Sequence, residues 1–291
     1  YTKFKELGAE FDLGDGYLEH LTNYDVVFRT PGMYFNNPAL TAARKQGVII
    51  TSEMETFFDL CPCRIYGVTG SDGKTTTTTL ISEMLAKTGR RVYKGGNIGK
   101  ALLPLIETIR EEDAAVVELS SFQLISMRRS PDVAVITNIS PNHLDVHGTM
   151  EEYIGCKENL IAHQNAYSKT VLNLDNAQTA ALAEQVRGRL LWFTRQQKPE
   201  RGTFLDAEGW LCYAEAGKTQ RIVRAEDIRI PGLHNVENYL AAIAAVWGEV
   251  PAETIVEVAK TFGGVEHRIE FVRELDGVKW YNAVSYTHLR A

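Results

Sequence analysis

Short runs of apolar residues recur along the middle of the chain, and segments with helical periodicity separate them. The runs contain almost no polar position and lie at residues 114–117, 133–136, 170–174 and 190–193. A strand that is apolar on both faces must be buried on both faces, as in a parallel sheet covered by helices. The pattern therefore predicts an α/β fold with a central, mostly parallel sheet flanked by helices.

The first sixty residues carry a weaker pattern of the same kind. Residues 24–28 and 47–50 read as strands, and residues 37–45 between them read as a helix, which is half of another α/β domain. Turn signals in region 177–227 favour antiparallel hairpins there. We expect part of one α/β domain at 1–60, a complete central domain at 61–264 and too few residues for a further core at 265–291, with the chain cut at both ends.

Residues 67–76 form a glycine-punctuated segment, Gly-Val-Thr-Gly-Ser-Asp-Gly-Lys-Thr-Thr, directly after the apolar residues 64–66. Glycines allow a tight turn that presents backbone N–H groups to an anion, and the following helix start adds its positive end. Lys74 supplies a charge, and the Thr75 hydroxyl can hold Mg²⁺. Val68 stands where the strict phosphate-loop pattern has glycine, so a generic glycine-rich turn is the alternative.

Charge and cysteine content narrow the class of protein. The formal net charge is −6, and no basic stretch is interleaved with aromatic residues, so we expect no nucleic-acid partner. No apolar stretch is long enough for membrane insertion. The four cysteines are too few for a disulfide framework, and Cys61 and Cys63 lack the two-residue gap of a zinc or redox pair. We expect a soluble, monomeric, cytoplasmic protein.

Two polar residues follow apolar runs at the edge of the sheet where ligands bind in open parallel sheets. Glu118 ends the run that begins at Ala114, and His143 follows the run that ends at Ile136. Glu118 is either a magnesium ligand or a residue that positions water, or else a carboxylate that caps the next helix. His143 is either a functional group at the same edge or a solvated surface residue.

Lys157 lies in the middle of an apolar stripe on the helix expected at 151–163. It is three or four residues from each apolar member of that stripe: Tyr153, Ile154, Leu160 and Ile161. One interpretation is a lysine that reaches water along its methylene stem. The other is a desolvated amine of lowered pKa, which can pair with phosphate or react with CO₂ to form a carbamate.

A third cluster of polar residues opens the helix expected from residue 235 onward. His234, Asn235 and Asn238 crowd its first turn. Helix N-capping explains one asparagine but not all three residues. Contact with a base or a phosphate is the alternative.

Together these motifs resemble those of the Mur ligase family, and within it the enzymes that add D-glutamate. The resemblance covers roughly residues 20–282 and rests on segments 69–76, 96–99, 117–124, 137–145, 232–238 and 267–268 and on Lys157. The run Glu-Leu-Ser-Ser-Phe-Gln at 118–123 points to the D-glutamate-adding members rather than to folylpolyglutamate synthase, which stays as an alternative.

The resemblance implies a three-domain ligase that uses ATP and Mg²⁺ at two sites. In this chain it implies a partial Rossmann-like domain at 1–60, an ATP-binding central domain at 61–264 and the start of a third α/β domain at 265–291. Its substrates would be UDP-N-acetylmuramoyl-L-alanine, bound in part by the first domain, and D-glutamate, and an acyl phosphate would be the intermediate of this step in peptidoglycan synthesis. Catalysis would involve Lys74, Glu118, His143 and Lys157. One magnesium would lie on Thr75 and Glu118 and the second on His143 and a carbamylated Lys157.

The resemblance also assigns the binding residues. Residues for the nucleotide would be Gly70, Ser71, Asp72, Gly73, Lys74, Thr75, Thr76, Asn235, Asn238 and Arg268. Residues for the muramoyl substrate would be Thr30, Asn97, Ser120 and Gln123.

The chain departs from the family pattern from Ala283 onward, where we expect a truncation or a foreign junction. Because the missing part would carry the D-glutamate contacts, we expect nucleotide binding with poor or no ligation. Two other classes stay open: a phosphate-loop kinase or NTPase, and a nucleotide-binding fragment without turnover.

Overall fold

The structure is a computed structural model that describes residues 2–141, 148–265 and 270–282. Within these residues, nine strands form one sheet in the order β11-β10-β9-β8-β7-β6-β3-β5-β4. The strands are β3 (Arg64–Thr69), β4 (Val92–Gly96), β5 (Ala114–Glu118), β6 (Val133–Ile136), β7 (Lys169–Asn173), β8 (Arg189–Thr194), β9 (Gly202–Leu205), β10 (Trp210–Glu215) and β11 (Lys218–Arg224). All neighbours from β4 to β9 pair in parallel, and β10 and β11 continue the sheet antiparallel.

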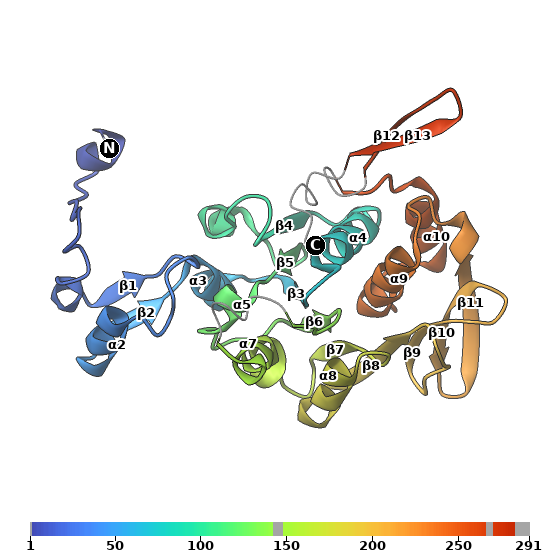
Figure 1. The fold of residues 1–291 in the computed structure, drawn as a ribbon, viewed down its shortest axis with the longest axis horizontal. Helices are drawn as coiled ribbons and strands as arrows, with labels where there is room; N and C mark the ends of the chain where they lie inside the picture. The colour runs from blue at the N-terminus through green and yellow to red at the C-terminus, as the bar shows by residue number, and fades with distance from the viewer. Residues whose placement is uncertain (1, 142–147, 266–269, 283–291) are drawn as a thin grey trace.

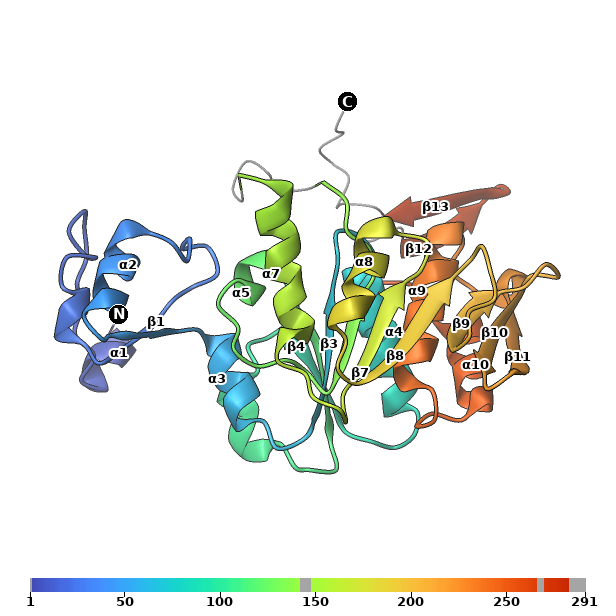
Figure 2. The same cartoon turned by 90° about the horizontal axis from the view of Figure 1, so that it is seen from below.

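Helices cover both faces of this sheet (Figures 1 and 2). One face carries α4 (Lys74–Ala86), α9 (Leu233–Val246) and α10 (Ala252–Thr261). The other carries α3 (Glu53–Leu60), α5 (Ser121–Leu124), α7 (Met150–Ala162) and α8 (Ala177–Ala181). Side chains alternate along β3, so that Tyr66 and Val68 join the first core and Ile65 joins the second. The predicted α/β class is confirmed.

Short 3₁₀ turns connect several of these elements: η2 (Leu103–Thr108), η3 (Leu182–Gln185) and η4 (Ala225–Asp227). None of the helices in the described ranges is both long and apolar enough to cross a bilayer.

An N-terminal unit precedes the large sheet. Its elements are α1 (Thr2–Glu6), η1 (Leu21–Asn23), β1 (Val26–Phe28), α2 (Pro38–Lys45) and β2 (Ile49–Thr51), and β1 and β2 pair in parallel. Figure 2 shows this unit beside α3 and α5. The buried Arg29 fastens it there, because its guanidinium donates to the carbonyl oxygens of Met33 and Phe122 and to Ser126 Oγ.

The other end of the chain forms a separate antiparallel hairpin of β12 (Glu270–Leu275) and β13 (Val278–Asn282). The expected hairpins at 177–227 are confirmed only in part. Antiparallel pairing is confined to β9, β10 and β11, whereas α8 and the parallel strand β8 occupy the first part of that region. The reason is burial, since Leu191 and Phe193 of β8 belong to the core under α9.

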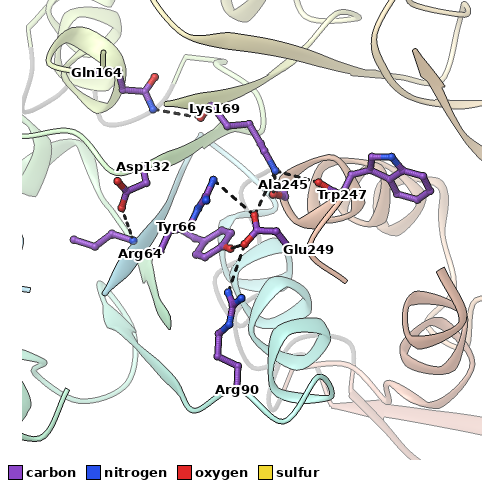
Figure 3. A network of polar contacts seen from close by, with 10 residues as sticks. Arg64, Tyr66, Arg90, Asp132, Gln164, Lys169, Ala245, Trp247 and Glu249 are labelled. Carbon is purple, nitrogen blue, oxygen red and sulfur yellow. Dashed lines mark hydrogen bonds and ion pairs between the residues drawn. The ribbon is translucent and has the colours of Figure 1, made fainter. Parts of the chain in front are cut away.

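A network of polar contacts lies at the edge of the sheet formed by the amino ends of β3 and β7 (Figure 3). Glu249, which follows α9, accepts a hydrogen bond of 2.6 Å from the buried Tyr66 hydroxyl. Its carboxylate also lies 3.5 Å from Arg90, 3.6 Å from Lys169 and 3.7 Å from Arg64. The network ties the end of α9 to the sheet at the edge opposite the glycine-rich loop.

Candidate active site

The glycine-rich loop connects the end of β3 to the start of α4. Gly70 and Gly73 have φ values of +149° and +79°, which side-chain-bearing residues rarely adopt. The space is also closed, because a Cβ on Gly70 would lie 1.9 Å from Thr137 Oγ1 and one on Gly73 would lie 2.3 Å from Asn238 Oδ1. No side chain caps the first turn of α4. The N–H groups of this first turn and the loop amides together form an anion-binding start of a helix.

Residues that follow β6 hold this loop in shape. Asn138 accepts from the Asp72 N–H and donates to the Asp72 carbonyl, at 2.9 and 3.1 Å. The Asn138 carbonyl accepts from the Ser71 N–H at 2.9 Å, and Thr137 Oγ1 donates to the Asp72 carbonyl at 2.6 Å. Sequence reasoning gave Thr137 and Asn138 no role, although their place directly after a strand end was a usable signal.

The Thr75 hydroxyl and the Glu118 carboxylate meet across the start of α4. Thr75 Oγ1 donates to Glu118 Oε2 at 2.7 Å, and Asn97 Nδ2 donates to Glu118 Oε1 at 2.8 Å. Glu118 is only 1% exposed. A hydroxyl and one carboxylate beside a phosphate loop are the oxygen donors that Mg²⁺ prefers, with phosphate oxygens and water completing its shell.

The described residues contain no group of three or more His, Cys, Asp or Glu side chains that could hold a metal. The Thr75 and Glu118 oxygens fit a magnesium ion that arrives with a nucleotide.

Two lysines converge on a single carbonyl oxygen of the loop. Lys74 Nζ and Lys157 Nζ each lie 3.0 Å from the Gly70 oxygen, and Lys74 also donates to the Ser71 carbonyl at 3.0 Å. Lys157 is 1% exposed, and its Nζ lies 4.6 Å from the centre of the Tyr153 ring. Burial, followed by the charge of Lys74, lowers the pKa of Lys157 to about 7. The predicted burial of Lys157 is confirmed.

Tyr153 contributes more than its apolar ring. Its hydroxyl lies 3.1 Å from Ser71 Oγ, which also donates to the carbonyl of Ser140 at 2.9 Å. Sequence reasoning placed Tyr153 only in the apolar stripe of its helix, because spacing reports which face a residue occupies and not what its polar end contacts.

A cavity of about 430 Å³ opens beside the loop. Its lining includes Asp72, Gly73, Thr76, Asn138, His234, Asn235 and Asn238. Neither asparagine caps α9, which begins after Gly232 without a side-chain cap. Instead Asn238 Nδ2 donates to Asn235 Oδ1 at 3.2 Å, and Asn238 Oδ1 accepts from Thr77 Oγ1 at 3.3 Å. The volume is within the range of small-molecule sites.

The remaining predicted residues lie in three other places. Ser120 and Gln123 form a capping box at the start of α5, directly after β5. Thr30 is exposed in the N-terminal unit. His143 and Arg268 lie outside the described residues.

Comparison with known proteins agrees with this geometry. The family pattern described as Mur ligase middle domain matches residues 68–246. A relative named "UDP-N-acetylmuramoylalanine--D-glutamate ligase" in Acetivibrio thermocellus is 51% identical over 96% of this chain and 60% of its own length. A protein of the same name in Clostridium perfringens is 48% identical, with the same coverage. The chain thus spans about 60% of the length of these curated relatives.

Solved structures share the fold at low sequence identity. MurF from Acinetobacter baumannii is 16% identical, with a TM-score of 0.63 over 89% of this chain and 64% of that chain. A UDP-N-acetylmuramoyl-L-alanyl-D-glutamate--2,6-diaminopimelate ligase is 21% identical, with a TM-score of 0.60 over 81% of this chain and 59% of that chain. The matched pattern covers more than half of the chain, so the chain belongs to the Mur ligase family.

Proposed function

We propose that this chain carries the ATP-dependent centre of a ligase that joins D-glutamate to UDP-N-acetylmuramoyl-L-alanine in peptidoglycan synthesis. The supporting observation is the gathering of Lys74, Lys157 and the Thr75–Glu118 pair around the Gly70–Gly73 loop. Relatives of that name are about half identical over nearly the whole chain. Since ATP supplies the energy, we place the reaction in the cytoplasm.

The chemistry of the first step explains why these residue types gather here. A substrate carboxylate attacks the γ-phosphate of ATP, so two anions must approach each other, and positive charge has to lie where they meet. When bound, Mg²⁺ neutralises phosphate oxygens; Thr75 and Glu118 would hold it. Lys74 places an ammonium over the loop, and the amides from Gly70 to Thr76 would hold the phosphates.

The cavity beside the loop is proposed as the site of the nucleoside. Asn235 and Asn238 present amide groups at its wall, and Arg268 would contribute from the following segment. The proposed contacts to the muramoyl substrate come from Asn97, which donates to Glu118, and from Ser120 and Gln123 at the start of α5. Thr30 is proposed to lie toward the uridine end. The amine of D-glutamate then attacks the carbonyl carbon of the acyl phosphate, and phosphate leaves.

Lys157 is proposed to act as a carbamate. A pKa of about 7 leaves a large share of the amine neutral near neutral pH, and a neutral amine attacks the carbon of CO₂, forms an N–C bond and releases one proton. The product is an anion. With His143, it would hold a second magnesium near the acyl phosphate.

Carbon-13 NMR of the chain in labelled bicarbonate tests this modification. We expect a carbamate signal in the wild type that is absent in Lys157→Met and retained in Lys87→Met, whose lysine is exposed at the end of α4. If the wild-type spectrum lacks the signal even when CO₂ is supplied in excess, the proposal that Lys157 is carbamylated is contradicted.

Hydroxylamine trapping tests the proposed function. The purified chain, given ATP, Mg²⁺ and UDP-N-acetylmuramoyl-L-alanine, should form a hydroxamate, which requires an activated carboxyl group. Lys74→Met should abolish the product and Lys87→Met should not. ATP turnover that does not depend on the carboxylate substrate would point to a kinase or NTPase. ATP binding without formation of a hydroxamate would point to a nucleotide-binding fragment.

A further inference from the structure

Cys61 and Cys63 bring two sulfur atoms together at the connection between α3 and β3. Their Sγ atoms lie 3.5 Å apart across Pro62. Cys61 is the C-cap residue of α3, and its N–H donates to the Phe57 carbonyl at 2.9 Å. Cys63 immediately precedes β3 and therefore lies at the opposite end of that strand from the glycine-rich loop. The pair has no part in the proposed ligase chemistry.

The two thiols differ in access and in acidity. Cys61 is partly exposed, whereas Cys63 is 5% exposed. A hydrogen bond joins the two sulfurs, and Cys61 Sγ also donates to the Cys63 carbonyl at 3.8 Å. The contact between the sulfurs lowers the pKa of Cys61 and raises that of Cys63. Burial and the nearby Asp132 act against the lower pKa of Cys61. The accessible sulfur is thus also the one whose thiolate is stabilised, and the thiolate is the reactive form.

Room for a reagent exists next to the pair. A polar cavity of about 800 Å³ lies beside both cysteines, and its charged and titratable lining consists of Arg64, Arg128, Arg129, Asp132 and His163. Arg129 forms an ion pair with Asp59, and Arg128 donates to the Ile50 carbonyl at 3.3 Å. A small anionic disulfide can therefore reach Cys61 in surroundings that carry several cationic side chains.

We propose that Cys61 and Cys63 form a redox-active dithiol that exchanges with small-molecule disulfides and closes reversibly to a disulfide across Pro62. The Cys61 thiolate attacks one sulfur of the disulfide RSSR, forms a mixed disulfide with the RS group and releases RS⁻. The Cys63 thiol loses its proton and attacks Cys61 Sγ, releasing the second RS⁻. Two protein thiols are oxidised by two electrons, and RSSR is reduced to two thiols.

The ring that closes is small, so the reaction is expected to be reversible. The sulfurs must approach from 3.5 Å to about 2.05 Å, which is the length of a disulfide bond. A bond formed across a single intervening residue is geometrically constrained, and constrained or exposed disulfides are the easily reduced ones. The pair is thus expected to return to the dithiol in an excess of small thiol.

The other two cysteines serve as internal controls. Cys156 and Cys212 are buried, and burial raises the pKa of each thiol to about 11. Little thiolate is present at neutral pH, and the same reagents are expected to leave them unmodified.

Mass spectrometry after incubation with glutathione disulfide tests the proposal. Trypsin releases one peptide, residues 46–64, that contains both Cys61 and Cys63. We expect this peptide to lose two hydrogen atoms and to regain them in excess reduced glutathione, while the peptides with Cys156 and Cys212 keep their mass. A peptide that stays a dithiol, or that accumulates as a stable glutathione adduct in the wild type, would overturn the proposal.

Serine variants separate the two roles. Cys63→Ser should trap glutathione on Cys61, because no second thiol is left to release it. Cys61→Ser should leave the peptide unmodified, and Cys156→Ser should behave like the wild type. Thermal unfolding of each variant checks that it folds. Equal reactivity of Cys63 in Cys61→Ser would contradict the assignment of Cys61 as the attacking thiol.

Discussion

Lys157 shows how a single buried charge is tolerated at the site. Its amine is shielded from solvent, and it contacts the Gly70 carbonyl and the face of the Tyr153 ring. These contacts stabilise the ammonium only in part, since its pKa still falls to about 7. The pKa of this lysine therefore lies close to neutral pH, where the side chain readily loses its proton. This suits a residue that exists both as a charged ammonium and as a neutral amine.

The pKa of Lys157 predicts how stability changes with pH. The ordinary value, 10.5, applies in the unfolded chain, and about 7 applies in the folded chain, so between these values the unfolded chain binds more protons. The free energy of unfolding therefore rises with pH across this interval. Urea unfolding in CO₂-free buffer should show a smaller rise in Lys157→Met than in the wild type or in Lys87→Met.

Part of the slope will remain in Lys157→Met, because burial also lowers the pKa of Lys169 to about 8. A slope that is the same in Lys157→Met and in the wild type would mean that the amine keeps its ordinary pKa in the folded protein.

At the scale of elements, the approach of α9 to the start of α4 shapes the site. Gly73 is in close contact with Asn238 of α9, and Asn238 also accepts from Thr77 of α4. The loop conformation and the cavity beside the loop are therefore coupled, because one asparagine borders both.

Two glycines at the ends of α4 allow this coupling to be measured. Gly73 and Gly89 have φ values of +79° and +85°, but a Cβ on Gly89 would meet open space. Gly89→Ala should lose about 1 kcal/mol of unfolding free energy through backbone strain alone. Gly73→Ala should lose about 3 kcal/mol, because the clash with Asn238 adds to that strain. Urea unfolding measures both, and equal losses would contradict a tight contact between Gly73 and α9.

The sequence was sufficient to predict the elements whose periodicity is regular. Residues 133–136 coincide with β6, and the burial of Lys157 follows from the spacing of its neighbours. The sheet order beyond β7 was not predictable, because a local pattern does not report which strand lies beside which.

The polar contacts of the site were harder to predict than its position. Asn138 belongs to a motif that was recognised in the sequence, but its hydrogen bonds to the loop depend on the pairing of β6 with β3. Neither Asn235 nor Asn238 caps α9, because the helix begins after Gly232, before the predicted start; their contact with a base or a phosphate stays a prediction. The spacing of Cys61 and Cys63 gave no sign that their sulfurs lie 3.5 Å apart, because a side-chain rotamer decides that distance.

Over the whole molecule, the site lies at one edge of the sheet and a stabilising network at the other. Glu249 joins Tyr66, Arg64, Arg90 and Lys169 at the amino ends of the strands (Figure 3). Because this network connects the end of α9 to β3 and β7, it fixes the helix whose first turn borders the cavity.

Removing the charge of Glu249 should destabilise the fold. Glu249→Gln retains an acceptor for Tyr66 but leaves three cations without their carboxylate, so we expect a loss of about 2 kcal/mol. The matched control is Glu257→Gln, which removes the exposed pair with Lys87 and should change stability by less than about 0.5 kcal/mol. Urea unfolding at neutral pH measures the loss of unfolding free energy in both variants. Similar losses would show that the Glu249 network does not make a major contribution to holding α9 against the sheet.

Magnesium-dependent nucleotide binding tests the central claim most directly. Calorimetric titration of a non-hydrolysable ATP analogue, with and without Mg²⁺, can be carried out on this chain and needs no second substrate. We expect Mg²⁺ to tighten binding at least roughly tenfold, about 1.4 kcal/mol, in the wild type and in Glu257→Gln. We expect this gain to disappear in Glu118→Gln. A chain that does not bind the analogue, or an equal magnesium effect in Glu118→Gln, would contradict the assignment of Thr75 and Glu118 as the magnesium-holding pair of an ATP site.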